Sequence, residues 1–500
     1  MVHEPAQAGI IAIMCPAIRV TSNRGQVLPI APSYSAFQWL AIFEHELLLF
    51  AAIWFAIGAI DEFIVDALWL WRSKCGVART PRLIDDANDE LKGIAAVIVP
   101  AWRESAVIGA MVSHCLESWG QRHLRIYVGV YRNDQATLAA LTLLAHDPRL
   151  RVVLHDRDGP TTKADCLNRL YRAMCDDERR SGERVRSLVL HDAEDMVHPD
   201  ALCLMDRALD RVDFVQLPVR PEPQAASPWI AGHYCDEFAE AHTKDMVVRN
   251  WIGAGLPSAG VGCAFSRAAI DRIIERRGGR EPFAAECLTE DYEAGLLVSE
   301  TGGKSCFLRV RDRHGRLVAT REFFPATLGT SVRQKTRWLH GIAFQGWDRL
   351  GWRGRGCDLW MRVRDRRGPL VALVLAAAYM LIVIWPAARL AEAMGMIVPM
   401  AADPMVRALL LFNLASFCWR LVLRYGFTAQ EYGWVEGVRA IVRFPVGNVI
   451  SIMAARRAVV AYLKVLFGGK VRWDHTVHLA HPARLAGPTS AVMAPKLARR

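Results

Sequence analysis

The apolar positions in the later part of the chain form runs long enough to cross a membrane. Leu370–Leu390 is apolar except for one late arginine, and about 20 such residues let a helix span the hydrocarbon layer. Leu409–Leu423, extended by the apolar residues before it, predicts a second crossing. The run at 441–467 is divided by four basic residues, a pattern that favours an interfacial or re-entrant helix.

An earlier membrane segment is predicted at Leu47–Trp71, where carboxylates interrupt the apolar run. Asp61, Glu62 and Asp66 lie within it. A carboxylate at membrane depth is costly unless it faces protein or water. We therefore expect a helix that either spans the membrane with a polar face or lies on the membrane surface.

The basic residues predict how these segments are oriented. The connection at 391–404 contains no Lys or Arg, whereas basic clusters follow the first segment and precede the second. Because basic residues are retained on the cytoplasmic side, the long segment between the clusters is expected to be cytoplasmic. The clustered residues are Arg72, Lys74, Arg79, Arg82, Arg362, Arg364, Arg366 and Arg367.

Between about residues 92 and 330 the pattern changes to short β-rich runs that alternate with helical patterns. Helices are predicted at Ser105–Ser118 and Ala164–Met174. This alternation is typical of βαβ units and a mostly parallel sheet, whose ligand site lies beyond the carboxyl ends of the strands. The predicted strands are Ala95–Val99, Ile126–Val130, Val152–His155, Leu188–Leu190 and Phe214–Leu217.

The composition agrees with a membrane protein that has a large soluble part. Of the 500 residues 52% are hydrophobic, and the mean hydropathy is +0.13. The net charge is +11, but the basic residues gather beside membrane segments, which favours membrane lipid over nucleic acid as a partner. The 12 cysteines form no C-x-x-C pair, so neither a zinc site nor a disulfide framework is predicted.

Two acidic clusters are candidates for chemistry. Asp192, Glu194 and Asp195 come directly after a predicted strand. Carboxylates packed this tightly repel, and a divalent cation that also binds diphosphate oxygens would relieve the repulsion. Glu290 and Asp291 precede a helical run. Taken alone, the first cluster is better explained as a solvated turn, and the second equally well as a helix cap.

Five short motifs occur along the chain in an order that is informative about its family. They are a strand ending in Pro100-Ala101-x-x-Glu104, then Gly159–Asn168, Asp192-x-Glu194, Thr289-Glu290-Asp291 and Gln334-Lys-Thr-Arg337-Trp338. This order resembles membrane-bound family 2 glycosyltransferases, which include cellulose and hyaluronan synthases. The last motif, Q-x-x-R-W shortly before a membrane helix, resembles the processive branch. A closer resemblance, over about residues 40–480, is to bacterial inner-membrane glycosyltransferases of the phage-adsorption protein B type, carried by Arg333–Trp347 and Trp473–His478.

The resemblance implies an α/β fold of the GT-A type, with a nucleotide-sugar-binding domain inserted between transmembrane helices. It assigns the catalytic base to Asp291 and the metal ligands for Mg²⁺ or Mn²⁺ to Asp192 and Glu194. The donor nucleotide would also contact Pro100, Ala101, Glu104, Asp134 and Lys163. The acceptor and diphosphate would contact Glu290, Gln334, Arg337 and Trp338. The alternatives are a surface role for the lysine and an interfacial anchor for the arginine-tryptophan pair.

Two positions depart from the family pattern. Many relatives end a strand in Asp-Asp to hold uridine and ribose, but residues 130–134 read Val-Tyr-Arg-Asn-Asp. The nucleotide contact therefore rests on Asp134 or is altered. Glu194 stands where the second metal-binding Asp is usual; its longer arm still reaches a cation, and Asp195 is a competitor for that role.

The sequence thus predicts a multi-pass enzyme of the bacterial inner membrane that transfers a sugar, with inversion, from a nucleotide sugar to a growing polysaccharide. UDP is the expected nucleotide. The alternatives are single-sugar transfer to a lipid-linked acceptor, and a degenerate domain that docks an envelope, outer-membrane or phage-adsorption partner protein. The expected segments are 1–40 (N-terminal), 41–75 (first membrane segment), 76–345 (cytoplasmic GT-A domain), 346–369 (basic interfacial linker), 370–391 and 405–425 (transmembrane helices), 441–467 (interfacial helix) and 468–500 (tail).

Overall fold

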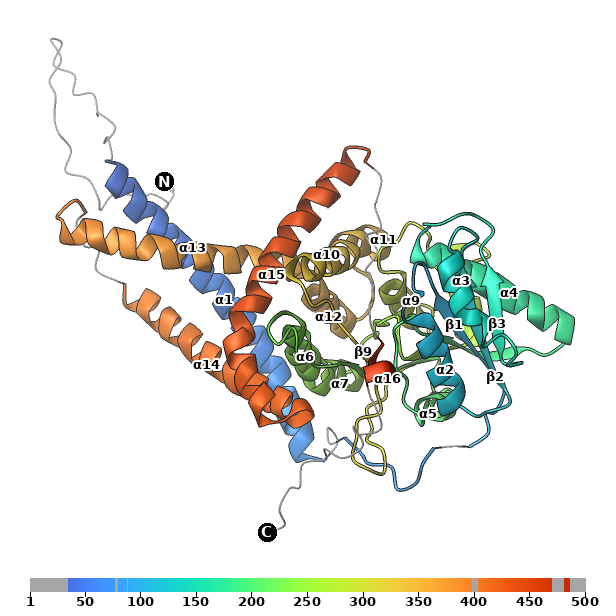
Figure 1. Cartoon of the computed structure of the whole chain (residues 1–500). Coiled ribbons are helices and arrows are strands. Elements are labelled where there is room, and N and C mark those ends of the chain that lie inside the picture. Colours follow the sequence, from blue (N-terminus) through green and yellow to red (C-terminus); the bar gives the residue numbers. More distant parts are fainter. Residues whose placement is uncertain (1–34, 77–79, 88, 398–402, 470–480, 486–500) are drawn as a thin grey trace, which may run out of the picture. The chain divides into compact units, whose positions relative to one another are not determined.

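The structure is a computed structural model that describes residues 35–76, 80–87, 89–397, 403–469 and 481–485 (Figure 1). Most of the predicted N-terminal segment, part of the connection at 391–404 and the Trp473–His478 motif lie outside these described residues. The chain divides into two compact units, residues 1–56 with 374–413 and residues 57–373 with 414–500. Each unit is described separately.

A seven-stranded mixed sheet forms the centre of the second unit. Its strand order is β3-β2-β1-β4-β7-β5-β8. Strands β1 to β4 are mutually parallel, as the alternating pattern predicted, whereas β7 runs antiparallel to β4 and to β5. The strands are β1 (Ile94–Pro100), β2 (Leu124–Val130), β3 (Leu150–Leu154), β4 (Val185–Leu190), β5 (Phe214–Gln216), β7 (Cys263–Ser266) and β8 (Ser305–Phe307).

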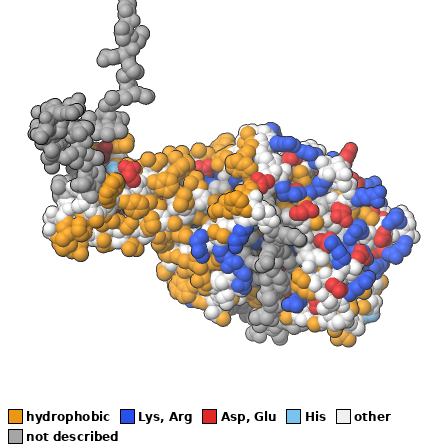
Figure 2. Space-filling model, turned by 90° about the horizontal axis from the view of Figure 1, so that it is seen from above, with side chains coloured by type: hydrophobic (Ala, Val, Ile, Leu, Met, Phe, Trp, Pro, Cys, Tyr) orange, Lys and Arg blue, Asp and Glu red, His pale blue; other side chains and the backbone are white. Residues whose placement is uncertain are grey.

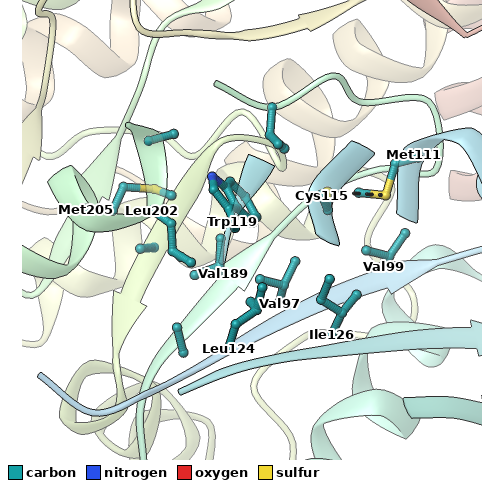
Figure 3. Close-up of a cluster of buried hydrophobic side chains, with 14 of the residues drawn as sticks. Val97, Val99, Met111, Cys115, Trp119, Leu124, Ile126, Val189, Leu202 and Met205 are labelled. Atoms are coloured by element: carbon teal, nitrogen blue, oxygen red, sulfur yellow. Dashed lines mark hydrogen bonds between the residues drawn. The ribbon is translucent and has the colours of Figure 1, made fainter. Parts of the chain in front are cut away.

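Helices cover both faces of this sheet because β1 is apolar on both sides. Every residue from Ile94 to Val99 is buried, as expected for a strand in the middle of a covered parallel sheet. Alternate residues of β1 belong to two hydrophobic cores, one on each face of the sheet. Val97 and Val99 pack with α2, α3 and α5, while Ile98 packs with α4, α8 and α9. Figure 3 shows the first core, in which Trp119 fills the space between helix and sheet. The helices are α2 (Ile108–Ser118), α3 (Gln135–Thr142), α4 (Lys163–Ser181), α5 (Ala201–Ala208), α8 (Arg267–Arg277) and α9 (Glu290–Glu300).

The remaining elements of the domain extend one edge of the sheet. Strands β6 (Val219–Pro221) and β9 (Thr320–Glu322) form a separate parallel pair. Two helices pass through a π-helical turn, a feature that is frequent at functional sites. The first comprises α6 (Ile230–Glu240), η1 (Ala241–Asp245) and α7 (Met246–Trp251); the second comprises α10 (Leu328–Leu339), η2 (His340–Gln345) and α11 (Gly346–Leu350), followed by α12 (Gly356–Arg366).

Among the residues that the structure describes, three helices are long and apolar enough to cross a membrane: α1 (Ala36–Lys74), α13 (Gly368–Ala393) and α14 (Pro404–Tyr432). Figure 2 shows hydrophobic side chains gathered over the membrane helices, and charged side chains of both signs over the sheet domain. Within the first unit, Arg389 bonds Glu44 at 3.2 Å and the Asn413 amide donates to the carbonyl of Ala52 at 2.9 Å. Polar groups between apolar helices are thereby paired, as a membrane segment requires.

The carboxylates that interrupt the first apolar run face protein partners in the second unit. The Lys244 side chain is fully buried in η1, and its ammonium lies 2.8 Å from Asp66 and 3.3 Å from Glu62. Asp61 bonds Arg364 and Arg367, the latter at 2.6 Å. The three carboxylates therefore face charged partners within the protein, and they fix the end of α1 to the sheet domain.

Helix α15 (Trp434–Leu466) is a single 33-residue helix despite Pro445. Small residues such as Gly437, Ala440 and Ala454 are buried in it, and its neighbours are α6 and α10. Large apolar side chains along the other side are exposed, among them Trp434, Val442 and Leu466. A short helix, α16 (Pro482–Leu485), lies beside α2.

Candidate active site

One solvent-open cavity lies beyond the carboxyl ends of β1 and β4, where the strand pattern predicted a ligand site. Its empty volume, including its mouth, is about 850 Å³. Ten of the twelve candidate site residues line it, and Asp134 and Glu290 do not. The full lining is Pro100, Ala101, Trp102, Glu104, Tyr131, Lys163, Cys166, Asp192, Ala193, Glu194, Ala259, Val261, Asp291, Glu322, Phe324, Gln334, Arg337 and Trp338.

The acidic wall of the cavity is formed by the turn after β4. Asp192 and Glu194 line the cavity, whereas Asp195 is fully buried behind them. The Asp195 carboxylate accepts hydrogen bonds from the Asp192 backbone N–H at 3.0 Å and pairs with His191 at 2.6 Å. Asp195 therefore shapes the turn, and its inward orientation removes it as a competitor of Glu194 for a cation in the cavity.

Lys163 faces this wall from the first turn of α4. The Thr162 hydroxyl caps that helix by accepting the Asp165 N–H. The Lys163 ammonium lies 2.6 Å and 2.9 Å from the two carboxylate oxygens of Asp192. Burial opposes the charged form, but the carboxylates of Asp192, Glu290 and Asp291 outweigh it and raise the pKa of Lys163. The lysine is therefore a charged member of the cavity and not a surface side chain.

The second acidic pair begins α9. Asp291 lines the cavity, and its carboxylate accepts the N–H of Tyr292 at 2.7 Å. Glu290 is buried, and burial together with the charge of Asp291 raises its pKa to about 7. Burial also raises the pKa of Asp291. A carboxylate with a raised pKa accepts a proton more readily near neutral pH, which is the property that a general base needs.

The Q-x-x-R-W residues lie on one face of α10. Gln334, Arg337 and Trp338 are spaced i, i+3 and i+4, so a helix brings all three to the cavity. The Trp338 ring packs against Phe324, with centroids 6.4 Å apart. The amide oxygen of Gln334 is buried without a hydrogen-bond partner among the described residues. The charge of Arg337 acts on the acidic pair, where it partly offsets the rise in the pKa of Glu290 and of Asp291. Gln334 thus offers a hydrogen-bond acceptor, and Arg337 a positive charge, to a polar ligand.

The π-helical turn η2 connects this motif to the acidic pair. The Gln345 side chain accepts the N–H of Leu288 at 2.9 Å and donates to the carbonyl of Glu286 at 3.2 Å. A Cβ at Gly341 would overlap Thr289, so the two segments are in close contact. The loop that presents Asp291 is therefore held by residues just after Q-x-x-R-W.

The end of the cavity beside β1 is built differently from the prediction. Pro100, Ala101 and Glu104 lie at the end of β1 as predicted. Asp134 instead caps α3: its carboxylate accepts the backbone N–H of Arg103 at 2.6 Å and that of Thr137 at 3.3 Å. Arg103 has a φ of 59°, an uncommon value for a residue with a side chain. Asp134 thus stabilises a strained turn beside the cavity.

Several lining residues were not identified from the sequence. Tyr131 directly follows β2, stacks on His155 with centroids 4.8 Å apart, and lies edge-on to Trp102. Glu322 ends β9, which is joined to the acidic turn by a hydrogen bond of 2.7 Å from Met196 to Arg321. Tyr131 lay within the segment already noted as a departure from the family pattern, whereas nothing local to Glu322 indicates a site.

The carboxylate groups on the acidic wall are suitable ligands for a divalent metal ion. Asp192 and Glu194 present hard oxygen ligands on one wall, which Mg²⁺ and Mn²⁺ prefer. No group of three or more His, Cys, Asp or Glu side chains converges on one point within the described ranges. Mg²⁺ usually completes its shell with water and substrate phosphates, so a pair of protein carboxylates is sufficient for a cation that arrives with a diphosphate.

Comparisons with known proteins identify the family. Residues 93–341 match the family model described as glycosyltransferase like family 2. Bacteriophage adsorption protein B of Escherichia coli strain K12 is 31% identical over 472 residues, or 88% of this chain. The chain belongs to glycosyltransferase family 2. This family 2 member also matches bacteriophage N4 adsorption protein B of Escherichia coli O157:H7 to the same extent, and it spans 62% of the length of either relative.

Solved structures are similar to this family 2 glycosyltransferase at lower identity. A mannosyltransferase from Pyrobaculum calidifontis in complex with GDP-Man and Mn²⁺ is 18% identical, with a TM-score of 0.48, and the match covers 79% of this chain and 98% of that one. TarS residues 1–349 of S. aureus in complex with UDP-GlcNAc is 12% identical, with a TM-score of 0.33, and the match covers 77% and 94%. The α/β fold of the GT-A type and the predicted resemblance to phage adsorption protein B are confirmed.

Proposed function

We propose that this chain transfers a sugar from a nucleotide sugar, with UDP as the expected nucleotide, to a growing polysaccharide at the cytoplasmic face of a bacterial inner membrane. The observation that carries the proposal is the convergence of three sequence-distant motifs on one cavity: Asp192 and Glu194, Asp291, and the α10 face with Arg337. Each motif alone has a structural explanation. Their meeting at the carboxyl edge of the sheet supports one active site.

In the proposed reaction the acceptor hydroxyl loses its proton to Asp291 as its oxygen attacks the anomeric carbon of the donor. Attack from the side opposite the diphosphate inverts the configuration. The Arg337 guanidinium offsets charge that develops on the leaving diphosphate. The Trp338 indole and the free amide oxygen of Gln334 provide an apolar plane and a hydrogen-bond acceptor for the acceptor sugar.

Asp192 and Glu194 are the residues that would hold Mg²⁺ or Mn²⁺. A divalent cation bound there would neutralise the donor diphosphate and stabilise the negative charge of the departing nucleotide. Pro100, Ala101 and Glu104 would form the nucleotide end. Asp134 contributes there indirectly, through the turn that it stabilises at Arg103.

The location at the membrane rests on the helices that flank the domain. Helices α1, α13, α14 and α15 overlap the segments proposed at 41–75, 370–391, 405–425 and 441–467. Exposed apolar side chains on α15 support an interfacial position next to α10. This position would bring a polysaccharide or lipid-linked acceptor from the membrane surface to the cavity.

A panel of nucleotide sugars tests the proposal. Purified protein in lipid nanodiscs is incubated with UDP- and GDP-linked sugars and Mn²⁺, and released nucleotide is measured with and without a lipid extract or oligosaccharide acceptor. Turnover that produces long products supports the polysaccharide function. Labelling of the lipid with one sugar per molecule supports transfer of a single sugar to a lipid carrier. If no donor is turned over, the alternative that the domain docks an envelope or phage-adsorption partner protein is favoured.

A further inference from the structure

Lys163 and Asp192 form an ion pair at the position where the proposed function places a metal. The ammonium lies 2.6 Å from one carboxylate oxygen of Asp192 and 2.9 Å from the other. Only 17% of the Lys163 side chain and 28% of the Asp192 side chain are exposed. An ion pair with this geometry occupies both oxygens that a cation would use.

The charges around the pair explain why the lysine adopts this position. Asp192, Glu194, Asp291 and Glu322 line the cavity, and the positive charges that line it are Lys163 and Arg337. Carboxylates this close repel each other when no ligand is bound. The ammonium offsets part of that repulsion, and it faces Asp192 because α4 begins directly opposite the acidic turn.

Donor binding changes this balance. The diphosphate diester of a nucleotide sugar brings two negative charges and a divalent cation brings two positive charges, so donor and cation enter the cavity together without adding net charge. The cation needs the oxygens of Asp192, and the diphosphate needs a positively charged donor. An exchange satisfies both requirements: the ammonium of Lys163 leaves Asp192 and bonds a diphosphate oxygen.

We propose that Lys163 is a built-in counter-ion that occupies Asp192 until the metal and the nucleotide sugar bind together, and then moves to the diphosphate. This inference rests on the proposed function. The Lys163 ammonium is tethered beside Asp192 and therefore competes with a cation for this carboxylate at a high effective concentration. A divalent cation without nucleotide thus binds weakly. Nucleotide and metal therefore bind cooperatively, and each binds more weakly without the other.

The inference predicts effects of opposite sign for one substitution. In Lys163→Met the competitor for Asp192 is removed, so Mn²⁺ without nucleotide should bind about 10-fold tighter. UDP in the presence of Mn²⁺ should bind about 10-fold weaker, because a charge-assisted hydrogen bond to the diphosphate is lost. A lysine that only supports the fold would weaken both affinities when it is replaced.

Calorimetry and the electron paramagnetic resonance signal of free Mn²⁺ measure both affinities in the full-length protein in detergent. Lys163→Arg should restore UDP binding in part, because it retains the positive charge. Lys92→Met is the matched control, since Lys92 pairs with Asp210 outside the cavity, and it should change neither affinity.

The outcomes separate this inference from the proposed function. Tighter Mn²⁺ binding together with weaker UDP binding in Lys163→Met supports the counter-ion. If the affinity for Mn²⁺ is unchanged or lower in this variant, the proposed counter-ion role of Lys163 is wrong, even where the wild-type protein binds UDP. If the wild-type protein binds neither UDP nor GDP with Mn²⁺ present, the proposed function fails as well.

Discussion

Gly260 gives a sharp test of where the reacting carboxylate must lie. This residue has a φ of +77°, and a Cβ added to it would meet the carboxylate of Asp291. Gly260→Ala therefore makes two changes. It introduces a side chain into the left-handed region, which costs about 1–2 kcal/mol, and it pushes the proposed base out of position.

The two effects have different magnitudes and different readouts. A displacement of a catalytic group by about 1 Å lowers the rate about 10²-fold, so kcat for nucleotide release should fall by about that factor. The affinity for UDP should change little, because the residues proposed to contact the nucleotide, Pro100, Ala101 and Glu104, lie at or just after the end of β1. The backbone strain lowers only the free energy of unfolding.

Gly278→Ala separates backbone strain from displacement of the base. Gly278 has a φ of +65° at the end of α8, and a Cβ there would meet nothing within 4 Å. Both variants should lose about 1–2 kcal/mol in thermal or denaturant unfolding, but only Gly260→Ala should lose kcat. If the two folded variants have equal kcat, Asp291 does not react from the position that the structure gives it.

The remaining predictions concern the loop, the pH profile and the topology. Gln345→Ala should lower kcat about 10-fold with UDP affinity unchanged, because two hydrogen bonds to the loop before Asp291 are lost; an unchanged kcat contradicts this role. Burial raises the pKa of Glu290 to about 7, and protonation of its coupled pair with Asp291 removes the base. The rate should therefore fall as pH drops below about 7, and a flat profile between pH 5 and 8 refutes this. On a cysteine-free background, Met394→Cys should react with an impermeant thiol reagent in intact cells and Ala140→Cys only after permeabilisation; the reverse result overturns the orientation.

The sequence predicted the elements that have a strong local pattern. Strands β1, β2 and β4 are rich in apolar residues and largely buried, and an apolar run long enough to cross a membrane indicates α13. Strands β6, β8 and β9 have three residues each, which is too short for any periodicity to show. The antiparallel β7 (Cys263–Ser266) follows a glycine-containing loop, and only its pairing with β4 and β5 in the sheet defines its direction.

Most of the residues that line the cavity could be predicted only from the order of the five motifs, because each acidic cluster alone has a structural explanation. A carboxylate after a strand is a candidate ligand, but the same position suits a helix cap, and Asp134 adopts the capping role because its neighbour Arg103 needs a hydrogen-bond acceptor. Glu322 reaches the cavity only because β9 bonds the segment after the acidic turn. Contacts of this kind depend on tertiary structure and leave no local signal.

The most direct test of the central claim separates binding from transfer in one substitution. Asp291→Asn keeps the shape of the side chain and removes its basicity. With the donor that the wild-type protein uses, UDP affinity in the presence of Mn²⁺ should stay nearly unchanged, while transfer of sugar to acceptor falls by about 10²–10⁴-fold, the usual contribution of a positioned base. An Asn variant that binds UDP and transfers sugar at the wild-type rate would contradict the account.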